Sequence, residues 1–97
     1  MRTAQIIYNP AAGRFPVVPS IPSAERALRT AGWDVDSAET RSGEHATELA
    51  TSAAAKGIDA IFAVGGDGTI GQIASGLVGT KTALGILPAG TANVWGK

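Results

Sequence analysis

Cysteine is absent from the 97-residue sequence, which excludes a disulfide scaffold and a thiolate metal site and fits a reducing compartment. Neither sign of charge is in excess, because eight lysines and arginines balance eight aspartates and glutamates. The chain therefore lacks an overall field that would attract nucleic acid. No apolar run approaches the roughly 18 residues that span a bilayer. These absences favour a globular cytoplasmic protein, and the length favours one domain.

What is present is an alternation of apolar patterns at strand and helix spacing. The predicted strands are residues 3–8, 33–38, 58–64 and 83–87, and the predicted helices begin near Pro22 or Ser23, at Glu44 and at Thr69. Strands that alternate with helices favour a parallel sheet with helices on both faces. We therefore expect an α/β fold of three layers with a mostly parallel sheet. The weaker, alternating pattern of residues 33–38 predicts a strand at an edge or in a half-exposed position.

The stretch from Gly65 to Gln72 joins the third predicted strand to the third predicted helix. It reads Gly-Gly-Asp-Gly-Thr-Ile-Gly-Gln, and backbone N–H groups at such a helix start can bind an anion. Residues 66–71 satisfy G-x-G-x-x-G, but no Asp or Glu follows Asp67 to hold a ribose. The turn also lacks the Gly-Lys-Ser/Thr of a Walker loop. Neither of these two phosphate-binding patterns fits.

Asp67 changes what this turn can bind. Its carboxylate would repel a phosphate at close range unless a divalent cation lies between the two groups. The turn therefore predicts a phosphate–Mg²⁺ site, with glycine N–H groups on the phosphate and Asp67 on the metal. A structural alternative stays open, because Asp67 can bond nearby N–H groups and Thr69 with Gln72 fits the capping box T-x-x-Q.

Small polar residues also follow the other predicted strands. Asn9-Pro10-Ala11-Ala12-Gly13 follows the first strand, Thr40 the second, and residues 88–93 the fourth. Because ligands of parallel sheets bind outside the carboxyl ends of the strands, these residues together predict a nucleotide-sized pocket. We expect His45 to be an exposed helix residue rather than a base, and Trp33 to pack at a strand edge.

Three motifs, taken in order, resemble the catalytic domain of diacylglycerol kinases and of related bacterial lipid kinases and sphingosine kinases. They are Asn9-Pro10-Ala11-Ala12-Gly13, Gly65-Gly66-Asp67-Gly68-Thr69 and Leu87-Pro88-Ala89-Gly90-Thr91-Ala92-Asn93. Gly-Gly-Asp-Gly alone also occurs in NAD kinases, so the flanking motifs decide between the families. The resemblance implies the N-terminal domain of the fold that diacylglycerol kinases share with NAD kinases. It also implies ATP as donor, Mg²⁺, and a lipid hydroxyl such as that of diacylglycerol as acceptor.

The resemblance assigns roles to individual residues. The residues that would bind the nucleotide and its phosphates are Asn9, Gly13, Thr40, Gly66, Asp67, Gly68, Thr69, Gln72 and Thr91, with Asp67 on the metal. No residue is convincingly the catalytic base. The chain departs from the family pattern at Gly71-Gln72, where Asn-Glu is usual, and at Val94, where Asp is frequent. These departures keep open a non-catalytic nucleotide-sensing or regulatory domain, and an NAD-kinase-like enzyme is a further alternative.

Members of this family have a much longer chain, with a second, mostly β domain that supplies the lipid pocket and an acidic base. Residues 1–97 are therefore expected to be a truncated nucleotide-binding domain that is inactive alone. The full-length protein is expected to act in phospholipid biosynthesis and to contact the membrane surface transiently. An uncovered sheet edge tends to associate, so we also expect a homo-oligomer.

Overall fold

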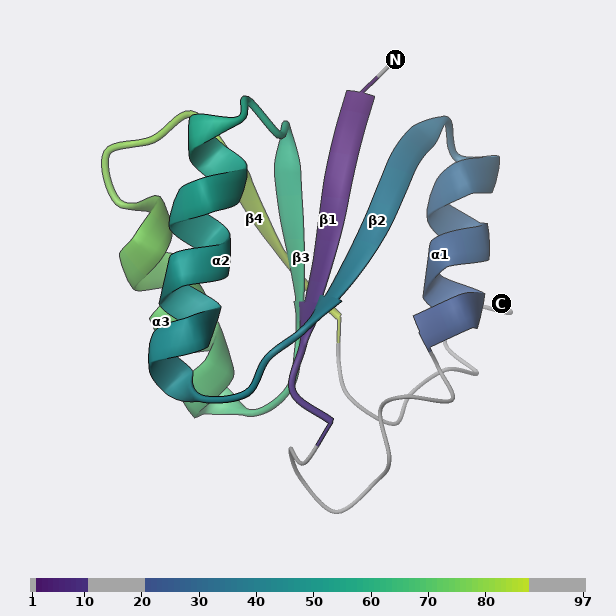
Figure 1. The fold of residues 1–97 in the computed structure, drawn as a ribbon. Helices are drawn as coiled ribbons and strands as arrows, with labels where there is room; N and C mark the ends of the chain where they lie inside the picture. The colour runs from purple at the N-terminus through teal and green to yellow at the C-terminus, as the bar shows by residue number, and fades with distance from the viewer. Residues whose placement is uncertain (1, 11–20, 88–97) are drawn as a thin grey trace.

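The computed structural model describes residues 2–10 and 21–87, which form a four-stranded sheet and three helices (Figure 1). In chain order the elements are β1 (Arg2–Tyr8), α1 (Ile21–Thr30), β2 (Trp33–Glu39), α2 (Gly43–Ala55), β3 (Ala60–Val64), α3 (Asp67–Leu77) and β4 (Ala83–Leu87). The alternation predicted from the sequence is confirmed, with boundaries that shift by one or two residues.

The sheet is parallel throughout, in the order β2-β1-β3-β4. β1 and β3 occupy its centre. β3 is apolar throughout, since both faces of a central parallel strand are covered, and β1 buries Ala4, Ile6 and Ile7. β2 lies at an edge, as its weaker pattern predicted. Asp59, just before β3, accepts a hydrogen bond from the Thr3 N–H at 2.8 Å and donates its own N–H to the Thr3 carbonyl at 3.0 Å. These bonds fix the register of the two central strands.

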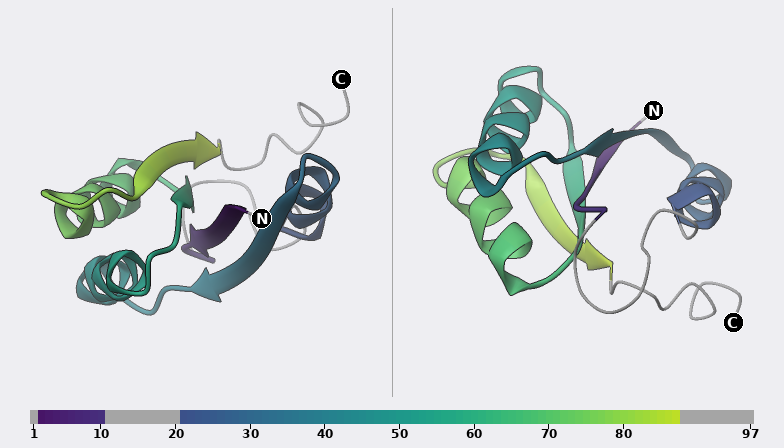
Figure 2. Two further views of the ribbon diagram at one scale, coloured as in Figure 1. Left: turned by 90° about the horizontal axis from the view of Figure 1, so that it is seen from above. Right: turned by 60° about the horizontal axis from the view of Figure 1, so that its bottom comes forward.

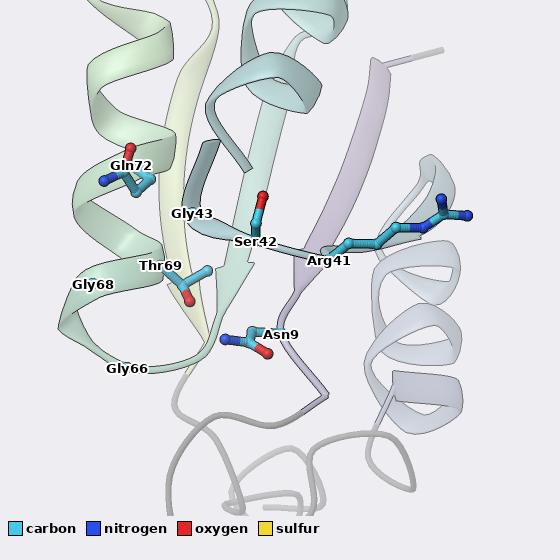
Figure 3. A pocket seen from close by; sticks show the side chains of 8 residues that line it. All are labelled: Asn9, Arg41, Ser42, Gly43, Gly66, Gly68, Thr69 and Gln72. Carbon is cyan, nitrogen blue, oxygen red and sulfur yellow. The ribbon is translucent and has the colours of Figure 1, made fainter. Parts of the chain in front are cut away.

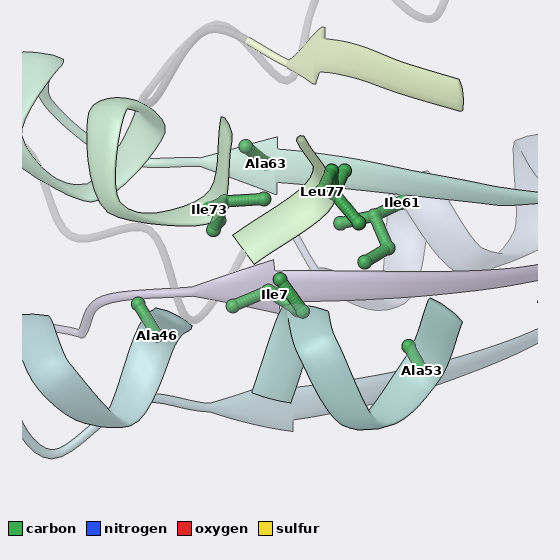
Figure 4. Close-up of a cluster of buried hydrophobic side chains, with 8 residues drawn as sticks. Ile7, Ala46, Ala53, Ile61, Ala63, Ile73 and Leu77 are labelled. Carbon is green, nitrogen blue, oxygen red and sulfur yellow. The ribbon is translucent and has the colours of Figure 1, made fainter. Parts of the chain in front are cut away.

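Helices cover both faces of the sheet, which confirms the predicted three-layer α/β class (Figures 1 and 2). α2 and α3 lie side by side on one face, and α1 lies on the other face beside β2. The side chains buried between the sheet and the pair α2 and α3 are Ile7, Ala46, Ala50, Ala53, Ile61, Ala63, Ile73 and Leu77 (Figure 4). None of the helices in the described ranges is long and apolar enough to cross a membrane.

Small residues allow α2 and α3 to approach each other closely. A Cβ atom built on Gly76 would lie 2.7 Å from the Thr47 carbonyl oxygen and 2.9 Å from the Ala50 Cβ. The Thr51 hydroxyl donates to the Gly76 carbonyl at 3.4 Å. This contact fixes the two helices against each other. Both helices follow parallel strands, so their N-termini point to the same edge of the sheet.

On the α1 face, an aromatic contact crosses the sheet. Trp33 of β2 meets Phe62 of β3 edge to face, with ring centroids 5.6 Å apart. The Phe62 ring lies over Gly85 of β4, where a Cβ atom would be 2.7 Å from the ring. The Arg2 guanidinium stacks on Trp33, 4.3 Å from its centroid. Trp33 thus packs at a strand edge, as predicted, and links three strands through one stack.

Candidate functional site

A cavity of about 380 Å³ opens at the edge of the sheet where β1, β2 and β3 end (Figure 3). It is bounded by the end of β1, by the loop between β2 and α2, and by the turn between β3 and α3. The lining residues are Asn9, Arg41, Ser42, Gly43, Gly66, Gly68, Thr69 and Gln72. Hydrogen bonds of the main chain hold the strand ends together, from the Asn9 N–H to the Val64 carbonyl at 3.3 Å and from the Thr40 N–H to the Tyr8 carbonyl at 2.8 Å.

The turn between β3 and α3 brings a helix N-terminus to this cavity. Gly65 has a φ of +156°, which L side chains rarely adopt, and a Cβ atom there would lie 3.1 Å from the Thr69 Cβ. Gly66 is extended and serves as the N-cap, so α3 begins at Asp67. The first bond of the helix runs from the Ile70 N–H to the Gly66 carbonyl. The N–H groups of residues 67–69 therefore have no acceptor within the helix and can bind an anion.

The capping box that the sequence permits is not formed. Its T-x-x-Q pattern requires Thr69 as the N-cap, but the N-cap is Gly66, and no side chain caps the helix there. The helix consequently starts two residues earlier than the predicted start at Thr69. An acidic residue at Asp67, in the first turn, favours this start because it interacts well with the positive end of the helix dipole. Thr69 instead packs its side chain against Gly65.

The opposite wall of the cavity is the start of α2. Ser42 is its N-cap, and the Ser42 hydroxyl accepts a hydrogen bond from the His45 N–H at 3.1 Å. The His45 Nδ1 in turn accepts from the Arg41 N–H at 3.0 Å. His45 is half-buried rather than exposed, which corrects the prediction of its exposure. Its contacts shape the capping turn, and this local role explains its burial.

Gln72 connects the two walls. Its side chain projects from α3, and the Thr47 hydroxyl of α2 lies 2.8 Å from the Gln72 Oε1 and 2.9 Å from the Gln72 carbonyl oxygen. Both distances are those of a hydrogen bond that the Thr47 hydroxyl donates. Two helix starts thus face one polar cavity at a fixed separation.

The charge at this cavity is sparse. Among the described residues that line it, Arg41 alone carries a charge, and its side chain extends away from Gln72 (Figure 3). Asp67 is exposed in the first turn of α3 but is not one of the lining residues. The N–H groups at the start of α3 are therefore the donors that could attract an anion here besides Arg41.

Comparisons with known proteins agree on one family. A model of the diacylglycerol kinase catalytic domain matches residues 3–97. The chain belongs to this family. It is 36% identical to a diacylglycerol kinase of Bacillus subtilis (strain 168) over 95 residues. The aligned residues are 96% of this chain and 31% of that protein. A diacylglycerol kinase of Staphylococcus haemolyticus (strain JCSC1435) is 34% identical over 98 residues, 99% of this chain and 30% of that protein.

The fold agrees as well. The crystal structure of a diacylglycerol kinase from Bacillus anthracis str. Sterne superposes with a TM-score of 0.78 at 28% identity, over 92% of this chain and 31% of that chain. The chain thus spans about a third of the length of these diacylglycerol kinases. The resemblance to this family, which the three motifs indicated, is confirmed.

The structure brings five of the predicted site residues of this kinase-family domain together around the cavity. They are Asn9, Gly66, Gly68, Thr69 and Gln72. Thr40 is buried and donates its N–H to the Tyr8 carbonyl, and Asp67 is exposed; neither lines the cavity. Two further predicted residues, Gly13 and Thr91, and the departure at Val94 lie outside the described residues.

Three lining residues, Arg41, Ser42 and Gly43, were missed by the sequence analysis as site residues. Their signal was available, because they follow the end of β2 on the same edge as Asn9. Ser42 also had a signal, because serine is preferred at N-caps and stands just before the predicted helix start at Glu44. Thr40, the residue predicted after this strand, lies one residue before the three that line the cavity.

The described residues offer few ligands for a metal ion. No group of three or more His, Asp, Glu or Cys side chains gathers within residues 2–10 and 21–87. Mg²⁺ does not require such a group, since it is commonly held by one or two carboxylates together with waters and substrate phosphates. The single carboxylate of Asp67 fits such a site, in which waters and phosphates supply the other ligands.

Proposed function

We propose that this chain is the nucleotide-binding domain of a lipid kinase, which binds ATP at the cavity between the starts of α2 and α3. The supporting observation is the N-terminus of α3, whose first N–H groups have no acceptor within the helix and lie beside Gly66, Gly68 and Thr69. These groups would bind phosphate oxygens, and Asn9 and Gln72 would add amide contacts from two sides. The donor phosphates would thereby be held in one orientation.

Asp67 has a separate role in this proposal. Its carboxylate would bind Mg²⁺ or the waters around it. When bound, the ion would neutralise charge on the transferring phosphoryl group. Without the ion, a carboxylate in the first turn would oppose phosphate binding. Phosphoryl transfer depends mainly on position and charge stabilisation, so N–H donors and one carboxylate are sufficient chemistry for the donor side.

The acceptor side would come from outside this chain. The diacylglycerol kinases it matches are about three times as long, and 31% of the Bacillus subtilis protein is covered. We infer that the lipid hydroxyl, the catalytic base and the transient membrane contact belong to a second domain of a full-length protein in phospholipid biosynthesis. Residues 1–97 alone are expected to bind ATP without phosphorylating diacylglycerol. Phosphorylation of diacylglycerol by the purified 97-residue protein, at the rate of a full-length kinase, would contradict this division.

Isothermal titration with ATP tests the binding site. The 97-residue protein is expected to bind ATP more tightly with Mg²⁺ than with EDTA. Asp67→Asn keeps the size of the side chain. It is expected to lower the affinity for ATP in the presence of Mg²⁺ about tenfold or more, the loss typical of weakened metal coordination. Glu48→Gln, an exposed carboxylate on α2 that does not line the cavity, is the matched control and should bind like the wild type. Equal Mg²⁺ dependence in both variants would refute the role of Asp67.

A second candidate is a nucleotide-sensing domain that has kept the fold without turnover. The observation that favours it is Gln72, which stands where the family usually has Glu and whose neutral amide contacts Thr47. Lipid-kinase turnover by the full-length protein, lost in Asp67→Ala, would decide for the enzyme. ATP binding with no turnover in the full-length protein would decide for the sensor.

A further inference from the structure

The α2–α3 contact contains two hydroxyl bonds of the same kind, one helical turn apart. Thr47 donates toward the Gln72 carbonyl and Oε1, at 2.9 and 2.8 Å. Thr51 donates to the Gly76 carbonyl at 3.4 Å. The two bonds differ in one respect that matters for the cavity. Only the Thr47 bond reaches a residue that lines it.

The Thr47 hydroxyl acts on both the main chain and the side chain of Gln72. One proton lies between two acceptors, so the bond is three-centred. A glutamine side chain is rotationally free on an exposed helix surface, and each such side chain that a ligand must immobilise weakens binding. Because Thr47 already restrains Gln72, a ligand would meet it in a preset position.

Gly43 leaves room for the Gln72 side chain at the start of α2. It is the first residue of α2, and a Cβ atom there would lie 3.4 Å from the Gln72 Cγ and 3.6 Å from its Nε2. The stem of Gln72 therefore lies across the start of α2 while its Oε1 contacts Thr47. The Gln72 side chain thus lies beside the first residue of α2, and Thr47 of the same helix holds its Oε1.

We propose that Thr47 is a positioning residue for the nucleotide site. It does not line the cavity. It acts through Gln72, by fixing the amide of that side chain and the first turns of α3 against the start of α2. The proposal rests on the proposed function, since it concerns the affinity of the same cavity for ATP.

The test compares two isosteric substitutions that each remove one hydroxyl of the pair. Thr47→Val is expected to weaken ATP binding about three- to tenfold, the range that corresponds to freeing one rotamer-rich side chain. Thr51→Val removes the bond one turn farther from the cavity and should change the affinity less than about twofold. Thr47→Ser keeps the hydroxyl and is expected to restore wild-type affinity. Titration calorimetry with Mg²⁺-ATP gives the three values.

A double-mutant cycle separates positioning from general stability. If Thr47 acts through Gln72, then Thr47→Val should add less than about a twofold loss in a Gln72→Ala background. An equal loss in both backgrounds would overturn the proposal, because the hydroxyl would then act through the fold. Wild-type affinity in Thr47→Val would overturn it as well.

A spectroscopic measurement does not depend on ATP at all. The Gln72 side-chain NH₂ resonances, assigned by their disappearance in Gln72→Ala, should move toward the values of a free glutamine in Thr47→Val and stay in place in Thr51→Val. Unchanged resonances in Thr47→Val would overturn the positioning role. If Thr47→Val shifts the resonances as expected but the wild-type protein binds no ATP, the nucleotide site is refuted. The Thr47–Gln72 contact is then established without a role in binding.

Discussion

Gly65 shows how one missing side chain shapes the cavity. Its φ of +156° turns the chain from the end of β3 into the N-cap at Gly66, and Thr69 packs directly over it. Any side chain at position 65 would be strained in its backbone and would also press on Thr69. The position of the first N–H groups of α3 depends on this turn.

Gly65→Ala is expected to destabilise the protein by about 1–3 kcal/mol, because a non-glycine residue in this backbone region is strained. Urea unfolding followed by circular dichroism measures the change. Gly66→Ala is the matched neighbour, since Gly66 has a φ of −87° and a Cβ atom there would meet nothing within 4 Å. Equal losses in the two variants would show that the turn does not require glycine at position 65.

Site residues could be predicted where their residue type, at the end of a strand, has few structural roles other than binding. Asn9 and the Gly-Gly-Asp-Gly-Thr turn were identified from their place after strands, and most of their residues line the cavity. Arg41 was not identified although it follows the end of β2, because an exposed arginine in a loop does not by its residue type distinguish a site from solvent. The start of α3 was predicted at Thr69 but lies at Asp67, so the place of Asp67 in the first turn of the helix was not predicted.

At the scale of elements, the pairing of α2 with α3 is what holds the two walls of the cavity. Gly76 permits the approach, and Thr47 and Thr51 fix it. The sequence predicted both helices from their apolar spacing. It could not predict their contact, because glycine in a helix interior is read only as a loss of helix propensity. The reason for glycine at position 76 is found only in the structure, where the Thr47 carbonyl of α2 occupies the space of a side chain.

Two glycines of α3 give a direct comparison. Gly76→Ala is expected to destabilise the protein by about 1–3 kcal/mol, because the new methyl group would overlap the Thr47 carbonyl and force the helices apart. Gly71→Ala, on the same helix with nothing within 4 Å of its Cβ position, should gain up to about 1 kcal/mol from helix propensity. Thermal and urea unfolding of both variants measure the difference. A gain in Gly76→Ala would mean that the close approach is not required for stability.

For the whole molecule, the class and order of elements followed from hydrophobic periodicity alone. The strand order β2-β1-β3-β4 did not, since four parallel strands joined by helices can be arranged in several ways. The edges of the sheet bear on the prediction of a homo-oligomer. β4 pairs within the described chain only with β3, and its Ile86 side chain is 55% exposed.

Association through this edge is expected to make the sedimentation coefficient rise with protein concentration, because an exposed strand edge with apolar side chains can pair with another chain. Ile86→Glu should reduce the association by placing a charge on the edge. Val78→Glu is the control, since Val78 is 81% exposed but lies at the end of α3, away from the strand. A monomer at all concentrations would contradict the prediction, and equal effects of both variants would exclude the β4 edge as the interface.

The central place of β1 also sets an order of assembly. β1 is made first, yet its partner on one side is β3, with Ala4 opposite Ala60. A growing chain therefore cannot complete the middle of the sheet until residue 64 has left the ribosome, and closing so long a loop is slow. The cavity takes its walls from the ends of β1, β2 and β3, so it exists only after that closure. A ligand that binds there would bind only the completed sheet, and it would therefore stabilise the pairing of β1 with β3.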